Sequence, residues 1–201
     1  MKRLTVAIAI AFVLWFVMFS QWTAPHLNFW YAMTVSACVL IYLSTYEVRR
    51  MPRFSYIEVL LGVCIAVVLW GVFWIGDKLS QLMFDFARNQ VDGIYDMKDG
   101  TAPWLIGLLL LFIIGPAEEL FWRGYVQRKL SVRWNPNVGF LVTTLIYTAV
   151  HLPSMNFMLI MAALTCGFCL GLLYRFIPQH FPAIVISHAV WDAAAFVWFP
   201  F

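Results

Sequence analysis

The sequence predicts an all-α fold, a polytopic transmembrane bundle of about seven helices, and its composition is the first reason. Of its 201 residues, 63% are hydrophobic and 11% are charged, whereas soluble domains are about 45–50% apolar and about 25% charged. The hydrophobic residues form long runs separated by short polar or proline-containing segments, and 18% of all residues are aromatic, as expected where rings gather at membrane interfaces. A soluble domain is therefore excluded, the lipid bilayer is an expected partner, and no nucleic-acid partner is expected.

The apolar runs divide residues 1–201 into spans of a single membrane-embedded domain. The run after Met1-Lys2-Arg3 is too long for a signal peptide and lacks a small-residue cleavage site, so we interpret it as the first span. The predicted spans are 4–22, 29–46, 54–75, 103–127, 138–151, 156–176 and 181–199. The fifth is short, because its fourteen residues cover roughly 21 Å of a hydrocarbon core that is about 30 Å thick.

Lysine and arginine predict the orientation of these spans. Ten of them fall on one side of the predicted topology and three on the other, Lys78, Arg88 and Lys98. Cytoplasmic loops carry the excess of basic residues. We therefore expect the N-terminus in the cytoplasm, the C-terminus outside, and a plasma (inner) membrane location.

Three further features of the sequence predict local structure: a polar segment, the cysteines and a pair of glycines. Residues 77–100 are predicted to be a solvated loop that starts with a short surface helix, and Glu58 is expected to extend to the membrane interface. The four cysteines lie inside apolar runs and predict packing rather than disulfides. Gly167 and Gly171 form a G-x-x-x-G pattern that favours a close helix approach.

Charged residues at the end of an apolar run give the strongest functional signal. Glu118, Glu119 and Arg123 follow the run 104–114, although each charge near a bilayer centre costs about 2.5–3.5 kcal/mol. Glu119 and Arg123 are i,i+4 neighbours and are expected to pair. Glu118 points about 100° away from Glu119, so we expect its carboxylate to be available for chemistry.

Two other predicted spans carry polar groups at overlapping depths. His151 ends the fifth span, with Tyr147 one turn earlier, and the seventh span carries His188 and Asp192 on one face. Intramembrane acids and histidines usually face a bundle interior or a watery cavity. We therefore expect Glu118, His151, His188 and Asp192 to meet in one buried pocket.

The expected chemistry of this pocket is hydrolysis. Glu118 with His151 could hold and deprotonate a water molecule, while His188 and a protonated Asp192 donate hydrogen bonds to the oxyanion. No cofactor is expected, but zinc is an alternative, with His151, His188, Glu118 and Asp192 as ligands. The H-E-x-x-H motif is absent, and we expect no serine or cysteine close to a histidine. A proton or ion pathway is the main competing function.

These residues resemble the signature of the CAAX protease and bacteriocin-processing (CPBP) family, which includes the prenyl-protein endopeptidase called Ras-converting enzyme. Its motif Glu-Glu-x-x-x-Arg is matched by Glu118, Glu119 and Arg123. Its motif Phe-x-x-x-His is matched at positions 147 and 151, with tyrosine for phenylalanine, and His-x-x-x-Asn at positions 188 and 192, with aspartate for asparagine. The motifs lie within residues 115–192.

The resemblance implies an intramembrane endopeptidase that cuts near the C-terminus of a protein or peptide bearing a C-terminal recognition segment. It implies that Glu118 and His151 activate water and that His188 and residue 192 stabilise the oxyanion. Asp192 in place of asparagine makes this oxyanion role depend on protonation, and Tyr147 adds a hydroxyl group that can donate a hydrogen bond. The alternatives are a non-catalytic scaffold or bacteriocin-immunity-type protein, and a small proton- or ion-coupled transporter.

Overall fold

The protein is described by a computed structural model that covers residues 1–48 and 55–201, and all regular elements in these ranges are helical. Within these ranges, five helical stretches are long and apolar enough to cross a membrane: Lys2–Phe19, Tyr56–Met83, Pro103–Arg133, Phe157–Phe176 and Pro178–Trp198. The second and fifth predicted spans are also helical, but their helices are shorter. The second corresponds to the apolar helix Phe29–Thr45 and the fifth to the helix Pro136–Ala149. Most of the segment 47–53, which separates the second and third predicted spans and contributes three of the basic residues counted above, lies outside the described residues.

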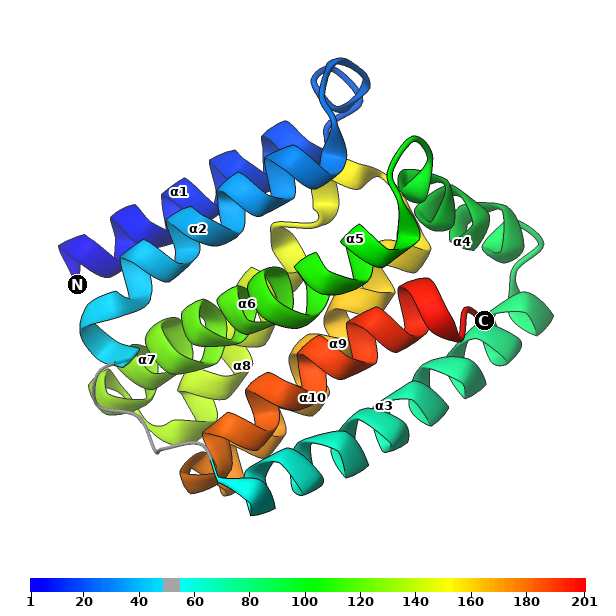
Figure 1. The fold of residues 1–201 in the computed structure, drawn as a ribbon. Coiled ribbons are helices and arrows are strands. Elements are labelled where there is room, and N and C mark those ends of the chain that lie inside the picture. The colour runs from blue at the N-terminus through cyan, green and yellow to red at the C-terminus, as the bar shows by residue number, and fades with distance from the viewer. Residues whose placement is uncertain (49–54) are drawn as a thin grey trace.

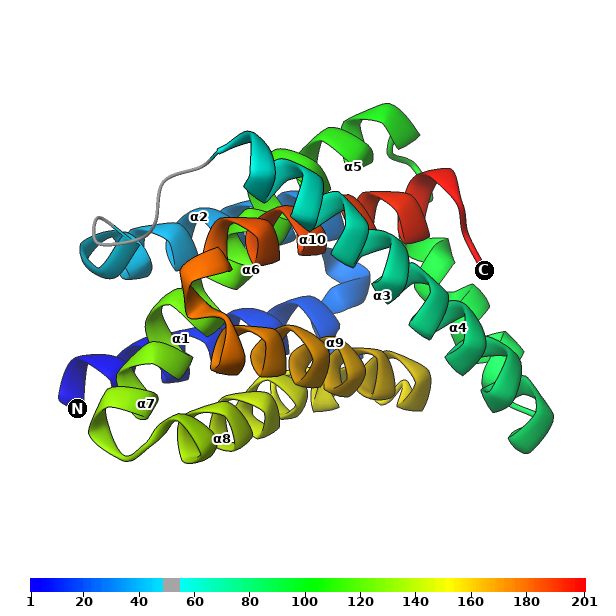
Figure 2. The same ribbon diagram turned by 90° about the horizontal axis from the view of Figure 1, so that it is seen from below.

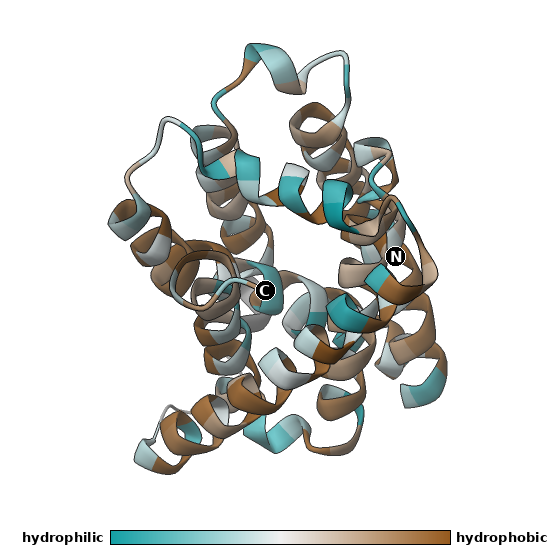
Figure 3. Cartoon of the chain, turned by 90° about the vertical axis from the view of Figure 1, so that its right-hand side faces the viewer, coloured by the Kyte–Doolittle hydropathy of each residue, from teal (hydrophilic) through white to brown (hydrophobic). Residues whose placement is uncertain are grey.

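The helices run back and forth between two ends of the bundle (Figures 1 and 2). In chain order they are α1 (Lys2–Phe19), α2 (Phe29–Val48), α3 (Tyr56–Met83), α4 (Ala87–Tyr95), α5 (Pro103–Leu109), α6 (Gly115–Phe121), α7 (Arg128–Arg133), α8 (Pro136–Ala149), α9 (Phe157–Phe176) and α10 (Phe181–Ala193). The central α6 contacts both α2 and α10, α3 packs along α10, and α8 packs along α9. Figure 3 shows hydrophobic residues along much of the helical surface, as expected for helices that contact lipid.

The helix that carries the acidic motif is continuous from Pro103 to Arg133. Two π-helical segments, Leu110–Ile114 and Trp122–Gln127, flank α6. Pro116 has no backbone N–H, so the hydrogen-bond ladder changes where α6 begins. Single π-turns are common at functional sites, and here they lie on either side of the helical segment that carries Glu118 and Glu119.

Glycines allow the site-bearing helices to approach closely. A Cβ atom on Gly115 would lie 2.6 Å from Ala189 Cα, so α6 reaches α10 only because residue 115 is glycine. A Cβ atom on Gly167 would lie 2.9 Å from Tyr147 Cδ1, and one on Gly171 would lie 3.0 Å from the Phe140 ring. The close helix approach predicted from the G-x-x-x-G pattern is thus confirmed between α9 and α8.

The prediction that residues 77–100 form mostly a solvated loop is wrong. α3 continues to Met83, and Asp77 within it is buried at 6% exposure. α4 packs on α9, and its residues Ala87 and Val91 are buried. Gln90 fastens α4, because its carbonyl accepts from Asn156 Nδ2 at 2.8 Å and its Oε1 from the Met158 N–H at 3.0 Å. Sequence periodicity could not show this contact because it joins segments that are 66 residues apart.

The prediction that Glu58 extends to the membrane interface is also wrong. Glu58 is 8% exposed and its carboxylate accepts from the Ala183 N–H at 3.1 Å and lies 2.9 Å from His180 Nδ1. The first turn of α10 presents backbone N–H groups without partners inside the helix. A carboxylate at that position satisfies one of them and interacts favourably with the helix dipole, so Glu58 ties α3 to the start of α10.

Candidate active site

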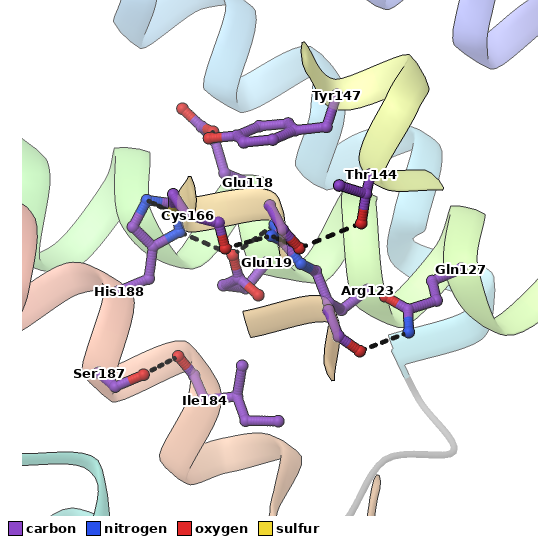
Figure 4. Close-up of polar contacts among 12 residues, drawn as sticks. Glu118, Glu119, Arg123, Gln127, Thr144, Tyr147, Cys166, Ile184, Ser187 and His188 are labelled. Atoms are coloured by element: carbon purple, nitrogen blue, oxygen red, sulfur yellow. Dashed lines mark hydrogen bonds and ion pairs between the residues drawn. The ribbon is translucent and has the colours of Figure 1, made fainter. Parts of the chain in front are cut away.

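Glu118 projects from α6 into the interior, where 5% of its surface is exposed. Its Oε2 accepts a hydrogen bond of 2.7 Å from the Tyr147 hydroxyl of α8, and the two side chains point toward one another in Figure 4. The CPBP motif has phenylalanine at this position. The hydroxyl group that tyrosine adds therefore holds the Glu118 carboxylate. The expectation that Tyr147 donates a hydrogen bond in this pocket is confirmed.

Glu119 is fully buried and has a different set of partners. Its Oε1 accepts from Arg123 Nη1 at 2.8 Å, which confirms the predicted i,i+4 pair, and lies 2.7 Å from His188 Nδ1. Arg123 also donates to the backbone carbonyls of Cys166 and Gly167 at 3.3 and 3.4 Å (Figure 4). Glu119 thus joins the motif helix to α10 directly and to α9 through the guanidinium group.

The contact between Glu119 and His188 was not predicted from the sequence. The spacing predicts His188 in the pocket and Glu119 in the pair with Arg123, but it does not show that the imidazole meets the second glutamate of the motif. A carboxylate only accepts, so His188 Nδ1 must carry a proton. This contact fixes the orientation of the ring and turns Nε2 toward Cys166 and Asp192.

His188 Nε2 faces two groups. Asp192 Oδ2 lies 3.8 Å away, and 24% of the Asp192 side chain is exposed. Cys166 Sγ of α9 also lies 3.8 Å away. The expectation that no cysteine lies close to a histidine is therefore wrong, and only the packing of α9 against α10 reveals this pair.

His151 follows α8 and is held by both ring nitrogens. Nδ1 lies 2.8 Å from the Tyr147 carbonyl, and Nε2 accepts from Trp15 Nε1 at 3.2 Å. A carbonyl only accepts and an indole N–H only donates, so the neutral ring carries its proton on Nδ1. Trp15 of α1 is fully buried, and nothing distinguishes it in a sequence with ten tryptophans.

A cavity of about 550 Å³ brings the predicted residues together. Its lining includes Glu118, Tyr147, His151, His188 and Asp192, so the three motifs meet at one site as the sequence indicated. The rest of the wall is mainly aromatic and aliphatic, with contributions from α2, α3, α4 and α9. An apolar cavity with a few convergent polar groups is the usual form of a substrate site.

The zinc alternative does not fit this arrangement. Among the described residues, no three His, Cys, Asp or Glu side chains are grouped so that they could hold a metal ion. His151 already uses both ring nitrogens, and a metal ion would have to displace the Trp15 indole from Nε2. We therefore derive no step through a metal ion.

The fold and this cavity define a multi-pass helical membrane protein with a buried acid–histidine site. Residues 100–194 match the family model described as Rce1-like, type II CAAX prenyl endopeptidase Rce1-like. This match covers just under half of the chain and supports the resemblance to the CAAX protease (CPBP) family inferred from the three motifs. No curated protein and no solved structure matches the chain.

Proposed function

We propose that this protein is an intramembrane endopeptidase in which Glu118 activates water. The observation that carries the proposal is the buried Glu118 carboxylate, which the Tyr147 hydroxyl holds at 2.7 Å beside the cavity that His188 and Asp192 also line. A carboxylate that is buried, oriented and open to a cavity is suited to act as a general base. Loss of cleavage in a Glu118→Gln variant that still folds is the decisive test.

In the proposed reaction, Glu118 takes a proton from water as the water oxygen attacks the carbonyl carbon of the scissile peptide bond. In this step His188 carries a proton on both ring nitrogens. Its Nε2–H and protonated Asp192 donate hydrogen bonds to the oxyanion that forms on the carbonyl oxygen. The carbon–nitrogen bond then breaks, and Glu118 returns the proton to the leaving amine. Glu119 supports this step as a positioning residue, because its carboxylate accepts from His188 Nδ1.

His151 is proposed to hold the attacking water together with Glu118. Its Nε2 is the ring atom that can accept from water, and this atom is engaged by Trp15 at 3.2 Å. The water must therefore share or replace the indole hydrogen bond when it binds. Trp15 thus controls access to His151 from a helix that lies outside the matched residues 100–194.

The proposed substrate is a protein or peptide at the membrane that carries a C-terminal recognition segment, whether or not it is lipidated. We propose seven spans with the N-terminus in the cytoplasm, in the plasma (inner) membrane, and we expect no cofactor. The described contacts give no specific support to the scaffold, immunity-protein or transporter alternatives.

We expect Tyr147→Phe to lower kcat by about tenfold with little change in KM, which corresponds to ~1.4 kcal/mol of lost transition-state stabilisation. The substitution removes the hydroxyl that orients Glu118 but keeps the ring that packs on Gly167, so the variant should fold. Kinetics on the purified enzyme with an apolar peptide library check this. Tyr31→Phe, at an exposed position on α2, is the matched control, and unchanged kcat in Tyr147→Phe would remove Tyr147 from the mechanism.

The Cys166–His188–Glu119 arrangement is compatible with a second mechanism. In it, His188 Nε2 takes the thiol proton, Cys166 Sγ attacks the carbonyl carbon, the amine leaves with that proton, and water then hydrolyses the thioester. The distances of 3.8 and 2.7 Å resemble those of a nucleophile, a base and an orienting acid. In the Glu118 mechanism the Cys166 thiol takes no part in the reaction. The Cys166 backbone carbonyl, which accepts from Arg123, is unchanged in Cys166→Ala. Our proposal therefore predicts that this variant keeps at least about half of wild-type kcat. Peptide cleavage assays check this, with Cys169→Ala as control, and an inactive but folded Cys166→Ala variant would support the thiol mechanism.

A further inference from the structure

The cavity lies entirely toward one end of the bundle. From Glu118 it extends along the second half of α3, the start of α9 and the end of α10. Its outer lining residues include Phe29 at the start of α2, Met83 at the end of α3 and Phe157 at the start of α9. These helix ends lie at the end of the bundle where α4 and the C-terminus are found (Figure 1). The path from the reacting groups to the surface therefore leads toward α4.

The opposite end of the bundle is closed below the site. Residues 122–127 are all buried, and Gln127 Nε2 donates to the Gly171 carbonyl at 2.8 Å. Farther along, a Cβ atom on Gly139 would meet the Ser131 backbone nitrogen at 2.6 Å, so α8 presses directly on α7. A peptide therefore has no route to Glu118 through this packed end without separating these helices.

Charge distinguishes the two ends. Lys2, Arg3, Lys129 and Arg133 line one surface hollow at the closed end. The helix ends and turns around α4, residues 77–100, contain five aspartates and three basic residues, which gives a formal charge of −2. Basic residues mark the cytoplasmic side of a membrane protein, so the closed end faces the cytoplasm and the open end faces outward.

α4 lies across the outward end of the cavity. Val91, Ile94 and Tyr95 contribute to the cavity wall, and the exposed ion pair between Arg88 and Asp92 lies on the adjoining face of the helix. An amphipathic helix in this position is suited to lie in the outer membrane interface. The Tyr95 hydroxyl donates to the Ala195 carbonyl at 3.1 Å and so ties α4 to the end of the α10 segment.

We propose that substrate enters the cavity from the extracytoplasmic side, under α4, and that the protein cleaves an apolar segment of an exported polypeptide in the outer half of the membrane. The apolar wall fits an apolar segment, and the closed cytoplasmic end leaves the outward route as the one that reaches Glu118. This inference rests on the proposed peptidase function and adds the side of the membrane from which the substrate reaches the active site.

Cysteine labelling in intact cells tests the direction of the opening. In a variant with Cys38, Cys64, Cys166 and Cys169 replaced by alanine, Ser80→Cys places a thiol in the cavity wall near α4, and Val132→Cys places an exposed thiol at the closed end. A membrane-impermeant maleimide should label the residue-80 thiol in intact cells and the residue-132 thiol only after permeabilisation. The reverse pattern would overturn the proposal.

Sidedness of cleavage is the second readout. A library of synthetic apolar peptides is added to right-side-out vesicles, to inside-out vesicles and to detergent-solubilised protein. We expect cleavage by right-side-out vesicles and solubilised protein, and at least a tenfold lower rate with inside-out vesicles. Faster cleavage by inside-out vesicles would overturn the inference and leave the peptidase function intact. If solubilised protein does not cleave, the proposed function fails and the labelling result alone decides which end is open.

Discussion

Glu118→Gln should abolish peptide cleavage, with a decrease in kcat of at least about a thousandfold, while the protein still inserts and accumulates. The amide keeps the shape of the side chain and can still accept from the Tyr147 hydroxyl, but it cannot take a proton from water. Removal of a general base typically costs 10²–10⁴-fold. Cleavage of the peptide library by purified protein measures the loss, and gel filtration with thermal unfolding verifies the fold.

The matched comparison for this variant is Glu58→Gln. Glu58 is also a buried glutamate, but it ties α3 to α10 and does not line the cavity, so its loss should lower stability and leave kcat nearly unchanged. Glu118→Gln should show the opposite pattern. Retained cleavage in Glu118→Gln would eliminate the proposed base, whatever the behaviour of the other variants.

Arg123→Ala should have the largest effect on stability, with a destabilisation of about 3–5 kcal/mol. Arg123 is 1% exposed and neutralises Glu119, which is fully buried. Removal of the guanidinium leaves that carboxylate without its main countercharge and removes a donor from the carbonyls of Cys166 and Gly167, of which Gly167 still accepts from Thr144. We expect a strong decrease in folded yield, measured by fluorescence size-exclusion chromatography of detergent extracts.

Arg88→Ala is the control for this prediction, because Arg88 and Asp92 also form an i,i+4 pair but on an exposed surface. Exposed pairs typically contribute less than about 1 kcal/mol, so this variant should accumulate normally. The double substitution Glu119→Gln with Arg123→Met should recover part of the yield, because it removes both charges. Equal yields for Arg123→Ala and Arg88→Ala would show that the buried pair does not hold the site together.

The sequence was sufficient to predict the long apolar helices and that residues of the three motifs line one cavity, because both follow from local signals. Long apolar runs define membrane helices, and ionisable residues inside such runs must face the interior. The pairing of Glu119 with Arg123 followed from helical periodicity alone. The continuous helix 103–133, with α6 at its centre, positions this motif as expected.

The contacts that orient His151 and His188 could not be predicted, because they join distant parts of the chain. Trp15 and His151 are 136 residues apart, and Cys166 and His188 are on different helices. Their positions depend on where small residues such as Gly115 and Gly167 let helices approach, which a single sequence does not show. The wrong predictions for Glu58 and for residues 77–100 have the same cause. Glu58 accepts a hydrogen bond from the first turn of α10, and Gln90 of α4 accepts one from the first turn of α9.

The chemical nature of the intermediate is the most direct test of a Glu118-activated water. Purified protein in excess is mixed with the apolar peptide library in water labelled with oxygen-18, quenched with acid within one turnover, and analysed by intact-mass spectrometry. Direct attack by water predicts oxygen-18 in each new C-terminal carboxylate and no peptide covalently bound to the protein, and both product and label should disappear in Glu118→Gln. A peptide adduct on the protein, lost in Cys166→Ala, would contradict this mechanism.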